Sequence, residues 1–321
     1  METLRIGVLG CADIARRRVL PAIRRFSGTD LVAVASRDPD KARSTAAESG
    51  CEAVHGYDTL LARADIDAVY VPLPAALHAR WVEAALRAGK HVLAEKPLTT
   101  DQDSTARLVT LAERHGLVLR ENVMFVHHGQ HRAVHRLVAD GAIGEVRALH
   151  AAFAIPRLRD DDIRYDPELG GGALWDTGVY PVRAALFLLG DDLEATGATL
   201  VRGGPGRGVD IAGTALLRTP EGVGAHLAFG LDHHYRSRYE IWGSEGTIVL
   251  DRAFTPPADH VPRIRLERKG GAEDITLPAQ DQVLRTVAAF AGAVRTGAGP
   301  DPAVLRQAAL LDEIRRRMRA A

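Results

Sequence analysis

The sequence predicts an α/β protein with an N-terminal domain built on a doubly wound parallel sheet and a C-terminal α/β domain with a mostly antiparallel, open sheet. Residues 1–122 alternate short apolar runs with amphipathic segments, which is the pattern of the first kind of sheet. Residues 123–321 carry successive alternating segments joined by short turns, as antiparallel strands do. A length of 321 residues also exceeds one ordinary core, so two domains are expected.

The strands of the first domain are expected to be short and buried on both faces. They are Leu4–Leu9, Leu31–Ala35, Cys51–His55, Ala68–Val71, His91–Ala94 and Leu117–Leu119. Helical segments lie between them at Asp13–Phe26, Asp38–Ser49, Ala75–Ala88 and Asp101–His115. Because proline has no N–H to donate, Pro21 is expected to kink or divide the first of these helices.

The second domain is expected to start with a helix at Gln130–Ala139, a strand near Val146–Ile155 and a helix near Val179–Leu189. Five further alternating segments are expected to be strands: Val209–Leu217, Val223–Leu231, Tyr239–Trp242, Thr247–Leu250 and Arg263–Leu266. The stretch 203–208 is rich in glycine and proline and is expected to be a loop. The chain ends in helical segments at Gln282–Val294 and Pro302–Arg319, and the last is a candidate to pack back on the first domain.

Composition excludes several functional classes. The 41 Lys and Arg residues balance 41 Asp and Glu residues, which leaves no electrostatic footprint for nucleic acid or an anionic membrane. No stretch approaches the roughly 20 apolar residues of a membrane span, and Met1–Arg5 carries no secretory signal. Cys11 and Cys51 match neither a metal-ligand spacing nor a disulfide framework. We therefore expect a soluble, cytoplasmic protein with no nucleic-acid or membrane partner.

The pattern Gly10-x-Ala12-x-x-Ala15 follows the first strand and resembles the G-x-G-x-x-G turn of Rossmann-type dinucleotide-binding domains. Gly10 suits the tight turn, and a helix that begins at Asp13 directs its free N–H groups toward a phosphate. A purely structural turn from strand to helix is the alternative. The residues expected to contact a dinucleotide here are Gly10, Cys11, Ala12, Asp13 and Ile14. Residues 1–122 are therefore the candidate dinucleotide-binding domain.

The residues after the second strand, Ser36-Arg37-Asp38, indicate which dinucleotide is expected. An acidic side chain at this point binds a ribose 2′-hydroxyl, whereas an arginine accommodates a 2′-phosphate. Ser36, Arg37 and the nearby Lys41 favour NADP(H) over NAD(H). In the alternative, Arg37 is an ordinary surface residue and Asp38 is the ribose ligand, although Asp38 stands before a proline and suits a helix cap better.

Further polar residues gather where strands are expected to end. Glu95-Lys96-Pro97 directly follows the fifth strand, and Leu73-Pro74 with His78 follows the fourth. These residues belong to the carboxyl edge of the sheet, where such folds bind ligands, so all are candidates for cofactor binding. Downstream, Asp176 and Tyr180 are four residues apart, and a helix there would place both side chains on one face.

Motifs from both halves of the chain resemble the Gfo/Idh/MocA family of oxidoreductases, in the order "GCADIARR", "ALRAGKHVLAEKPL", "ENVMFVHHGQH" and "GGGALWDTGVYPVRAA". More narrowly, they are similar to the NDP-hexose 3-ketoreductases of deoxysugar biosynthesis, a branch of that family. The resemblance implies an NAD(P)-binding Rossmann domain, a second domain (residues 123–321) that supplies the substrate site, and homodimers or homotetramers formed through the open sheet face. It also implies NADPH-dependent reduction at carbon 3 of a nucleotide-linked, probably dTDP-linked, keto sugar, and a cis Lys96–Pro97 bond.

Two positions differ from the pattern common in the family. Tyr180 stands where many members carry histidine, but the 3-ketoreductase branch resembles this chain in having tyrosine. Ala75 stands where many members carry asparagine, which puts one hydrogen bond to the cofactor in doubt.

The chemistry of ketone reduction assigns roles to three residues. Negative charge develops on the carbonyl oxygen, which needs a proton and a nearby cation. Tyr180 is expected to donate the proton, because the ammonium of Lys96 would lower its pKa from the usual value of about 10. Asp176 would orient Lys96 or bind the sugar. In the purely structural alternative, Lys96 is a solvated residue and Tyr180 packs against a helix.

Five other residues are candidates for substrate binding. Two begin the crossing to the second domain, two stand just before the glycine run, and the arginines among the five suit a diphosphate because arginine binds phosphate in a bidentate manner. The five are Asn122, Phe125, Arg157, Arg164 and Tyr165. His127, His128 and His131 suggest a metal, but no carboxylates stand nearby and a helix follows, so no metal is expected.

Two other functions stay open on the sequence alone. One is an NAD(P)-dependent dehydrogenase that oxidises a free sugar or inositol. The other is a non-catalytic, NADP-binding regulator, which would be expected to lack part of the Lys96, Asp176 and Tyr180 set.

Overall fold

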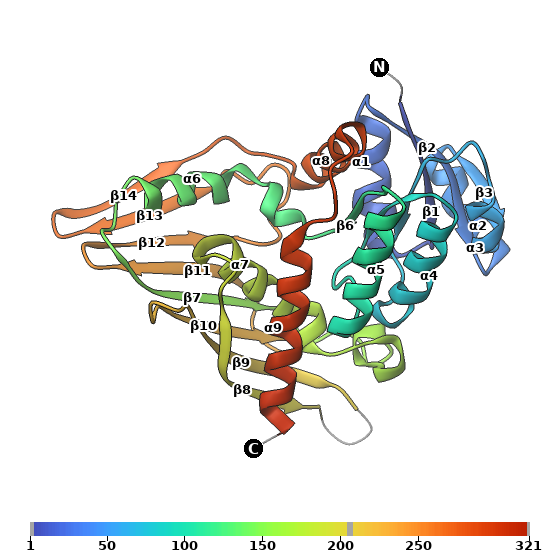
Figure 1. Cartoon of the computed structure of the whole chain (residues 1–321). Helices are drawn as coiled ribbons and strands as arrows, with labels where there is room; N and C mark the ends of the chain where they lie inside the picture. Colours follow the sequence, from blue (N-terminus) through green and yellow to red (C-terminus); the bar gives the residue numbers. More distant parts are fainter. Residues whose placement is uncertain (1–2, 204–207, 320–321) are drawn as a thin grey trace. The chain divides into compact units, whose positions relative to one another are not determined.

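The computed structural model describes residues 3–203 and 208–319, which form two compact units (Figure 1). The first unit contains the chain as far as Val123 and a returning segment, Val283–Val304. The second contains Met124–Gln282 and the chain from Leu305 onward. The sequence pattern had placed residues 123–321 in the second domain, with the last helix as the candidate to pack back on the first. Instead, Val283–Val304 belongs to the first unit and the chain from Leu305 onward to the second. Most of the loop expected at 203–208 lies outside the described residues.

The first unit contains a six-stranded sheet in which every strand pair is parallel, so the predicted doubly wound sheet is confirmed. Its order is β3-β2-β1-β4-β5-β6. The strands are β1 (Leu4–Leu9), β2 (Thr29–Ser36), β3 (Glu52–His55), β4 (Ala68–Val71), β5 (His91–Ala94) and β6 (Leu119–Glu121). The order reverses between β1 and β4, and the carboxyl ends of strands at such a reversal are where these sheets bind ligands.

Most helices of the first unit connect these strands, and α8 (Gln282–Thr296) returns from the end of the second sheet. The others are a π-helical segment at Ala15–Val19, α1 (Leu20–Arg25), α2 (Pro39–Ser49), α3 (Tyr57–Leu61), α4 (Ala75–Arg87) and α5 (Gln102–Arg114). Next to Pro21 the helix changes type, from the π-helical turn to α-helix at Leu20, and the backbone stays helical across this junction. In α8 the buried apolar residues Val283, Val287 and Phe290 recur at helical spacing, which explains why this segment joins a core.

The second unit contains an eight-stranded sheet of order β14-β13-β12-β11-β7-β10-β9-β8. Its strands are β7 (Val146–Ala154), β8 (Glu194–Arg202), β9 (Asp210–Arg218), β10 (Gly224–Gly230), β11 (Arg236–Gly243), β12 (Gly246–Asp251), β13 (Arg263–Arg268) and β14 (Gly271–Thr276). Only the central β7–β10 pair is parallel, so the sheet is mostly antiparallel as predicted. The sequence pattern did not predict β8 or β14.

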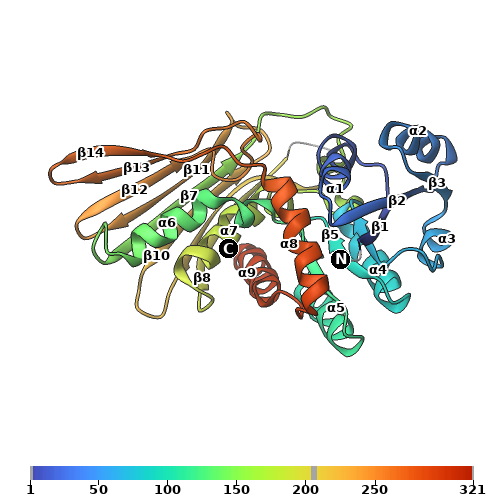
Figure 2. The ribbon, with the colours of Figure 1, turned by 90° about the horizontal axis from the view of Figure 1, so that it is seen from above.

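The longer helices of the second unit are α6 (Gly129–Ala139), α7 (Val179–Leu189) and the part of α9 (Pro302–Arg319) that follows Val304. Figure 2 shows these helices against one face of the sheet. Along β11, buried residues alternate with exposed or half-buried ones, so the opposite face of the sheet is open. The last helix joins the second unit through Arg306 and Glu313, which hydrogen-bond the backbone of the 191–195 segment.

Short helical turns complete this unit at Met124–His127, Ile163–Tyr165, Pro167–Leu169 and, as a π-helix, Leu174–Gly178. Among the residues described, no helix has both the length and the apolar character to cross a membrane.

Candidate active site

The first position of the turn after β1 has a backbone conformation that favours glycine. Gly10 has φ +123°, and a Cβ built there would lie 2.9 Å from Cδ2 of Leu73. Its N–H donates to the carbonyl oxygen of Ala35 at 2.9 Å, which fixes the turn to the end of β2. The predicted tight turn is therefore confirmed. A backbone without a side chain at this point fits the close approach of a dinucleotide pyrophosphate.

The end of β2 distinguishes the two alternatives for Asp38. Its Oδ1 accepts hydrogen bonds from the N–H groups of Asp40 at 2.9 Å and Lys41 at 3.2 Å, so Asp38 caps α2 as the sequence favoured. Ser36 is buried, and its Oγ accepts the N–H of Asp38 at 3.1 Å. The Arg37 and Lys41 side chains are exposed. Because the Asp38 carboxylate already accepts backbone N–H groups, it is not the expected ligand of a ribose 2′-hydroxyl. The exposed Arg37 beside it fits a 2′-phosphate and therefore NADP(H).

His78 joins the loops that follow β4 and β5. The ring is fully buried, with Nε2 2.6 Å from the Leu73 oxygen and Nδ1 2.8 Å from the Pro97 oxygen. Burial lowers the pKa of His78, and the two carbonyl groups partly oppose that shift. Leu73 and Pro74 are half-buried at the start of α4. His78 thus sets the position of both candidate cofactor loops from beneath.

Glu95 and Asn122, both expected in the binding site, take part in an internal network. Oε1 of Glu95 accepts hydrogen bonds from the Tyr70 hydroxyl at 2.7 Å and from Nδ2 of Asn122 at 2.6 Å. All three side chains are buried. The next residue, Lys96, is half-buried and precedes a cis bond to Pro97, as the family resemblance implied. The network holds the backbone that carries Lys96.

The glycine-rich bend of the second unit directs the chain into α7. A Cβ at Gly172, which has φ +124°, would lie 2.5 Å from Oδ1 of Asp210. Oδ2 of Asp210 accepts the N–H of Leu174 at 2.7 Å, at the start of the π-helical turn. Burial raises the pKa of Asp210. Sequence reasoning missed Asp210, whose only signal is a carboxylate at the start of a strand.

Asp176 lies in the π-helical turn Leu174–Gly178, and Tyr180 lies in the first turn of α7. Nε of Arg164 donates to Oδ2 of Asp176 at 2.8 Å, and Nη1 of Arg164 lies 3.2 Å from Oδ1 of Asp162. The two carboxylates raise the pKa of Arg164, with Asp176 as the larger cause. A candidate substrate arginine and a candidate catalytic carboxylate therefore form one ion pair, whose side chains are 39% and 18% exposed.

Three phenylalanine rings surround Tyr180. Its ring centroid lies 4.6 Å from that of Phe153, 5.8 Å from that of Phe254 and 6.2 Å from that of Phe125. Phe125 is completely buried, while Tyr180 is partly exposed. Phe125 therefore supports the tyrosine from within the core. Sequence reasoning missed Phe153 and Phe254, although Phe153 stands in a predicted strand.

Two other candidate substrate residues have structural partners. The hydroxyl of buried Tyr165 donates to the Leu231 oxygen at 3.2 Å and accepts the N–H of Leu158 at 3.1 Å. Arg157 is exposed and pairs with Asp160 at 2.9 Å. Within the described residues, no cluster of three His, Cys, Asp or Glu side chains is arranged to hold a metal ion.

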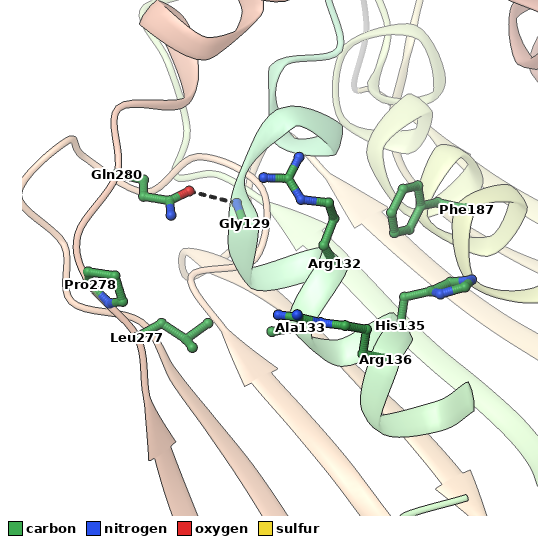
Figure 3. A pocket seen from close by; sticks show the side chains of 9 residues that line it. All are labelled: Gly129, Arg132, Ala133, His135, Arg136, Phe187, Leu277, Pro278 and Gln280. Atoms are coloured by element: carbon green, nitrogen blue, oxygen red, sulfur yellow. Dashed lines mark hydrogen bonds between the residues drawn. The ribbon is translucent and has the colours of Figure 1, made fainter. Parts of the chain in front are cut away.

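A pocket of about 750 Å³ lies beside α6 in the second unit (Figure 3). Its lining consists of Gly129, Arg132, Ala133, His135, Arg136, Phe187, Leu277, Pro278 and Gln280. The bond from Gly129 N–H to Oε1 of Gln280, 2.9 Å long, closes one side. None of the predicted site residues lines this pocket, so its size does not identify it as the reaction site.

Models of known families match both parts of the chain. Residues 4–123 match the NAD-binding Rossmann fold of an oxidoreductase family, and residues 131–249 match the GFO/IDH/MocA C-terminal domain.

Full-length relatives extend this match. The dTDP-3,4-didehydro-2,6-dideoxy-alpha-D-glucose 3-reductase of Streptomyces violaceoruber is 56% identical over 327 residues, which cover 98% of this chain and 95% of the relative. The reductase of the same name from Saccharopolyspora spinosa is 55% identical over 322 residues, with 98% and 97% covered. The structure of KijD10, a 3-ketoreductase from Actinomadura kijaniata in complex with NADP and TDP-benzene, superposes with a TM-score of 0.96 at 50% identity, covering 99% of this chain and 98% of that one.

Proposed function

Because the chain belongs to the Gfo/Idh/MocA family of oxidoreductases, we propose that it is an NADPH-dependent reductase of a ketone at carbon 3 of a dTDP-linked keto-deoxyhexose. The observation that carries this proposal is the 56% identity to a 3-reductase of that substrate class along 98% of the chain. Gly10 and Arg37 fit the cofactor, and Lys96, Asp176 and Tyr180 form a complete set of candidate reacting groups.

The proposed chemistry assigns the proton to Tyr180. When bound, NADPH supplies the hydride that reduces the carbonyl carbon. The negative charge that develops on the carbonyl oxygen is met by the phenol proton of Tyr180 and by the ammonium of Lys96. Both side chains are partly exposed, so neither is locked inside a core. Asp176, oriented by Arg164, binds a sugar hydroxyl or orients Lys96.

We further propose that the protein works in the cytoplasm, where its nucleotide-linked substrate and NADPH are supplied, and that it forms a homodimer or homotetramer. Support for assembly comes from the open face of the second sheet. Trp242 is 56% exposed there, with Leu216 at 39% and Val201 at 57%. Large apolar side chains that are exposed on a sheet face favour a protein interface.

Binding titrations test the function. Calorimetry with NADPH, NADH and dTDP should show tight binding of NADPH, weaker binding of NADH, and binding of dTDP to the NADPH complex. NADPH oxidation with a dTDP-linked 3-keto sugar should then be fast. Oxidation of free sugars or inositol with NAD(P), without any response to dTDP, would contradict the proposal and favour a catabolic dehydrogenase.

The same titration tests the cofactor assignment. Arg37→Ala removes the cation proposed to meet the 2′-phosphate, so NADPH affinity should fall at least about tenfold, the value of one charge-assisted hydrogen bond. NADH lacks that phosphate, so its affinity should change little. An equal loss for both cofactors would contradict the assignment.

A further inference from the structure

Arg252, which directly follows β12, has an unusual backbone conformation. Its φ is +51°, and it is the one residue other than glycine with positive φ in the part of the chain that the structure describes. A side chain in this region strains the backbone, and such residues cluster at ligand sites. We propose that Arg252 binds the diphosphate of the nucleotide-linked substrate, with Tyr235 holding its guanidinium in place.

Hydrogen bonds from two other elements fix the backbone that directly follows Arg252. Ser237 accepts the N–H of Ala253 through its carbonyl oxygen at 3.0 Å and the N–H of Phe254 through its hydroxyl at 2.9 Å. The carbonyl oxygen of Ala253 accepts a hydrogen bond from Nε2 of Gln130 at 3.0 Å and lies 2.9 Å from Nε2 of His131. Strand β11 and helix α6 thus impose the conformation of this turn. The strained conformation of Arg252 is therefore imposed by the surrounding fold, as is typical of residues at ligand sites.

The guanidinium of Arg252 keeps its charge for an external partner. Its Cζ lies 4.9 Å from the centroid of the Tyr235 ring, and the Tyr235 hydroxyl is 3.1 Å from Oγ1 of Thr255. Within residues 3–203 and 208–319, this guanidinium forms no ion pair. Nearby Arg238 instead lies 3.3 Å from Glu240 and 3.6 Å from Asp251. A ring that stacks on a guanidinium leaves its N–H edges able to bind two phosphate oxygens.

The residue lines a pocket that suits an anion. The pocket has a volume of about 590 Å³, and its lining is His234, Tyr235, Arg236, Ser237, Arg238, Asp251 and Arg252. Three arginines face one carboxylate, so the lining is net cationic. This balance favours a phosphate-bearing ligand over a neutral sugar.

Aromatic contacts connect Arg252 to the proposed proton donor within the second unit. The Tyr235 ring lies 6.4 Å from Phe153, and Phe153 lies 4.6 Å from Tyr180. Phe254, two residues after Arg252, lies 5.8 Å from Tyr180. A nucleotide sugar carries its diphosphate on carbon 1, two ring atoms from carbon 3, so one bound molecule requires both features close together. This inference rests on the proposed function and adds the residue that selects a nucleotide-linked substrate.

Calorimetry with dTDP tests the inference. Arg252→Ala should weaken dTDP binding to the NADPH complex at least about tenfold, because one charge-assisted contact is lost. Arg252→Lys should recover part of the affinity, since lysine keeps the charge but loses the bidentate edge. NADPH affinity should stay within about twofold of the wild-type value. Arg268→Ala, an exposed arginine on β13, is the matched control and should bind dTDP like the wild type.

The outcomes distinguish a failure of the proposed function from a failure of the assignment of Arg252. If the wild-type protein does not bind dTDP, the nucleotide-linked function fails. If it does and Arg252→Ala binds equally well, the assignment of Arg252 is wrong. Arg252→Gly removes the side chain without backbone strain, so it should fold at least as well as the wild type and still bind dTDP weakly. Wild-type affinity in this folded variant would also overturn the assignment.

Discussion

At the scale of single residues, Tyr180 combines access with a fixed orientation. Phe153, Phe254 and Phe125 surround its ring, yet the residue is partly exposed. Burial of aromatic rings against one another restricts the torsions that would otherwise let the phenol turn away. A proton donor needs this arrangement, because a misplaced acid loses most of its effect.

Tyr180→Phe removes the hydroxyl and keeps the ring. Turnover should fall by about 100-fold or more, the typical contribution of a positioned general acid. NADPH affinity should stay within about twofold, because the cofactor turn belongs to the first unit. Steady-state kinetics and NADPH fluorescence titration measure the two quantities.

The matched control is Tyr239→Phe. Tyr239 belongs to the same aromatic group, 6.4 Å from Phe254, but its hydroxyl lies 3.0 Å from Nδ1 of His131 inside the core. This variant should lose stability and keep turnover. Equal turnover in Tyr180→Phe and the wild type would remove Tyr180 from the proposed chemistry.

The supporting residues show how far sequence reasoning reaches at this scale. Gly10 and the cap at Asp38 depend on neighbours in the chain, and both were predictable. The role of Glu95 was not, because its partners Tyr70 and Asn122 are 25 and 27 residues away. Its motif indicated the right loop, but only the packed fold shows that the carboxylate holds the loop from inside. The same is true of His78.

At the scale of elements, the helices that lead into α1 and α7 share one irregularity. Each has a π-helical turn, Ala15–Val19 or Leu174–Gly178, and each has a proline shortly after it, Pro21 or Pro181. A proline removes one N–H from the helical ladder, and a wider turn accommodates the lost bond. Such turns are frequent at functional sites. The sequence predicted a break at Pro21, but it carried no signal for the wider turns.

The two missed strands have different causes. β8 contains Gly197 within an irregular register, so its alternation is weak. β14, with the sequence GAEDIT, is a mostly exposed edge strand, and no buried face gives it a pattern. Both strands form because a neighbouring strand supplies hydrogen bonds. Such pairing is a property of the sheet, and a single segment does not reveal it.

Helix α6 carries a prediction about pH. Its His131 is 1% exposed, and burial lowers its pKa to about 3. The unfolded chain therefore takes up the proton first, near pH 6.5. Stability should fall as the pH drops below about 6.5, by up to about 1.4 kcal/mol per pH unit, until the pH reaches the folded-state value. Urea unfolding at pH 7, 6 and 5 measures this loss.

The contribution of His131 is isolated by comparing variants. His131→Gln has no ionisable group, so the fall in stability with decreasing pH should be shallower than in the wild type. The exposed His135 lies on the same helix, and His135→Gln should keep the wild-type dependence. If His131→Gln also kept it, another group would be responsible for the acid sensitivity.

At the scale of the whole molecule, the chain passes between its two units more than once. The first unit is completed by Val283–Val304, which follows the entire eight-stranded sheet in sequence. Neither unit is therefore a single continuous stretch. Sequence reasoning predicted both sheets and named the last helix as the candidate to return, but the segment that returns is Val283–Val304. An amphipathic helix such as α8 shows that it has a buried face and not which core buries it.

We expect the open face of the second sheet, opposite its helices, to join copies of the chain. Trp242 lies on β11 and pairs across the strands with Thr247 and Ala148, on the side that the helices do not cover. A stable interface buries about 1,200–2,000 Å² and has aromatic residues at its centre. The exposed Trp242 side chain is the candidate for that centre.

Sedimentation equilibrium tests whether this face joins subunits. The wild-type protein should have two or four times the chain mass of 34.6 kDa. Trp242→Glu would bury a carboxylate without a partner in the interface. The free energy of burying that charge exceeds the binding free energy of such an interface at micromolar concentration. The variant should therefore shift toward the single-chain mass. Val261 is also 50% exposed but lies outside the strands, so Val261→Glu should assemble like the wild type. A wild-type mass of 34.6 kDa would show that this face does not join copies of the chain.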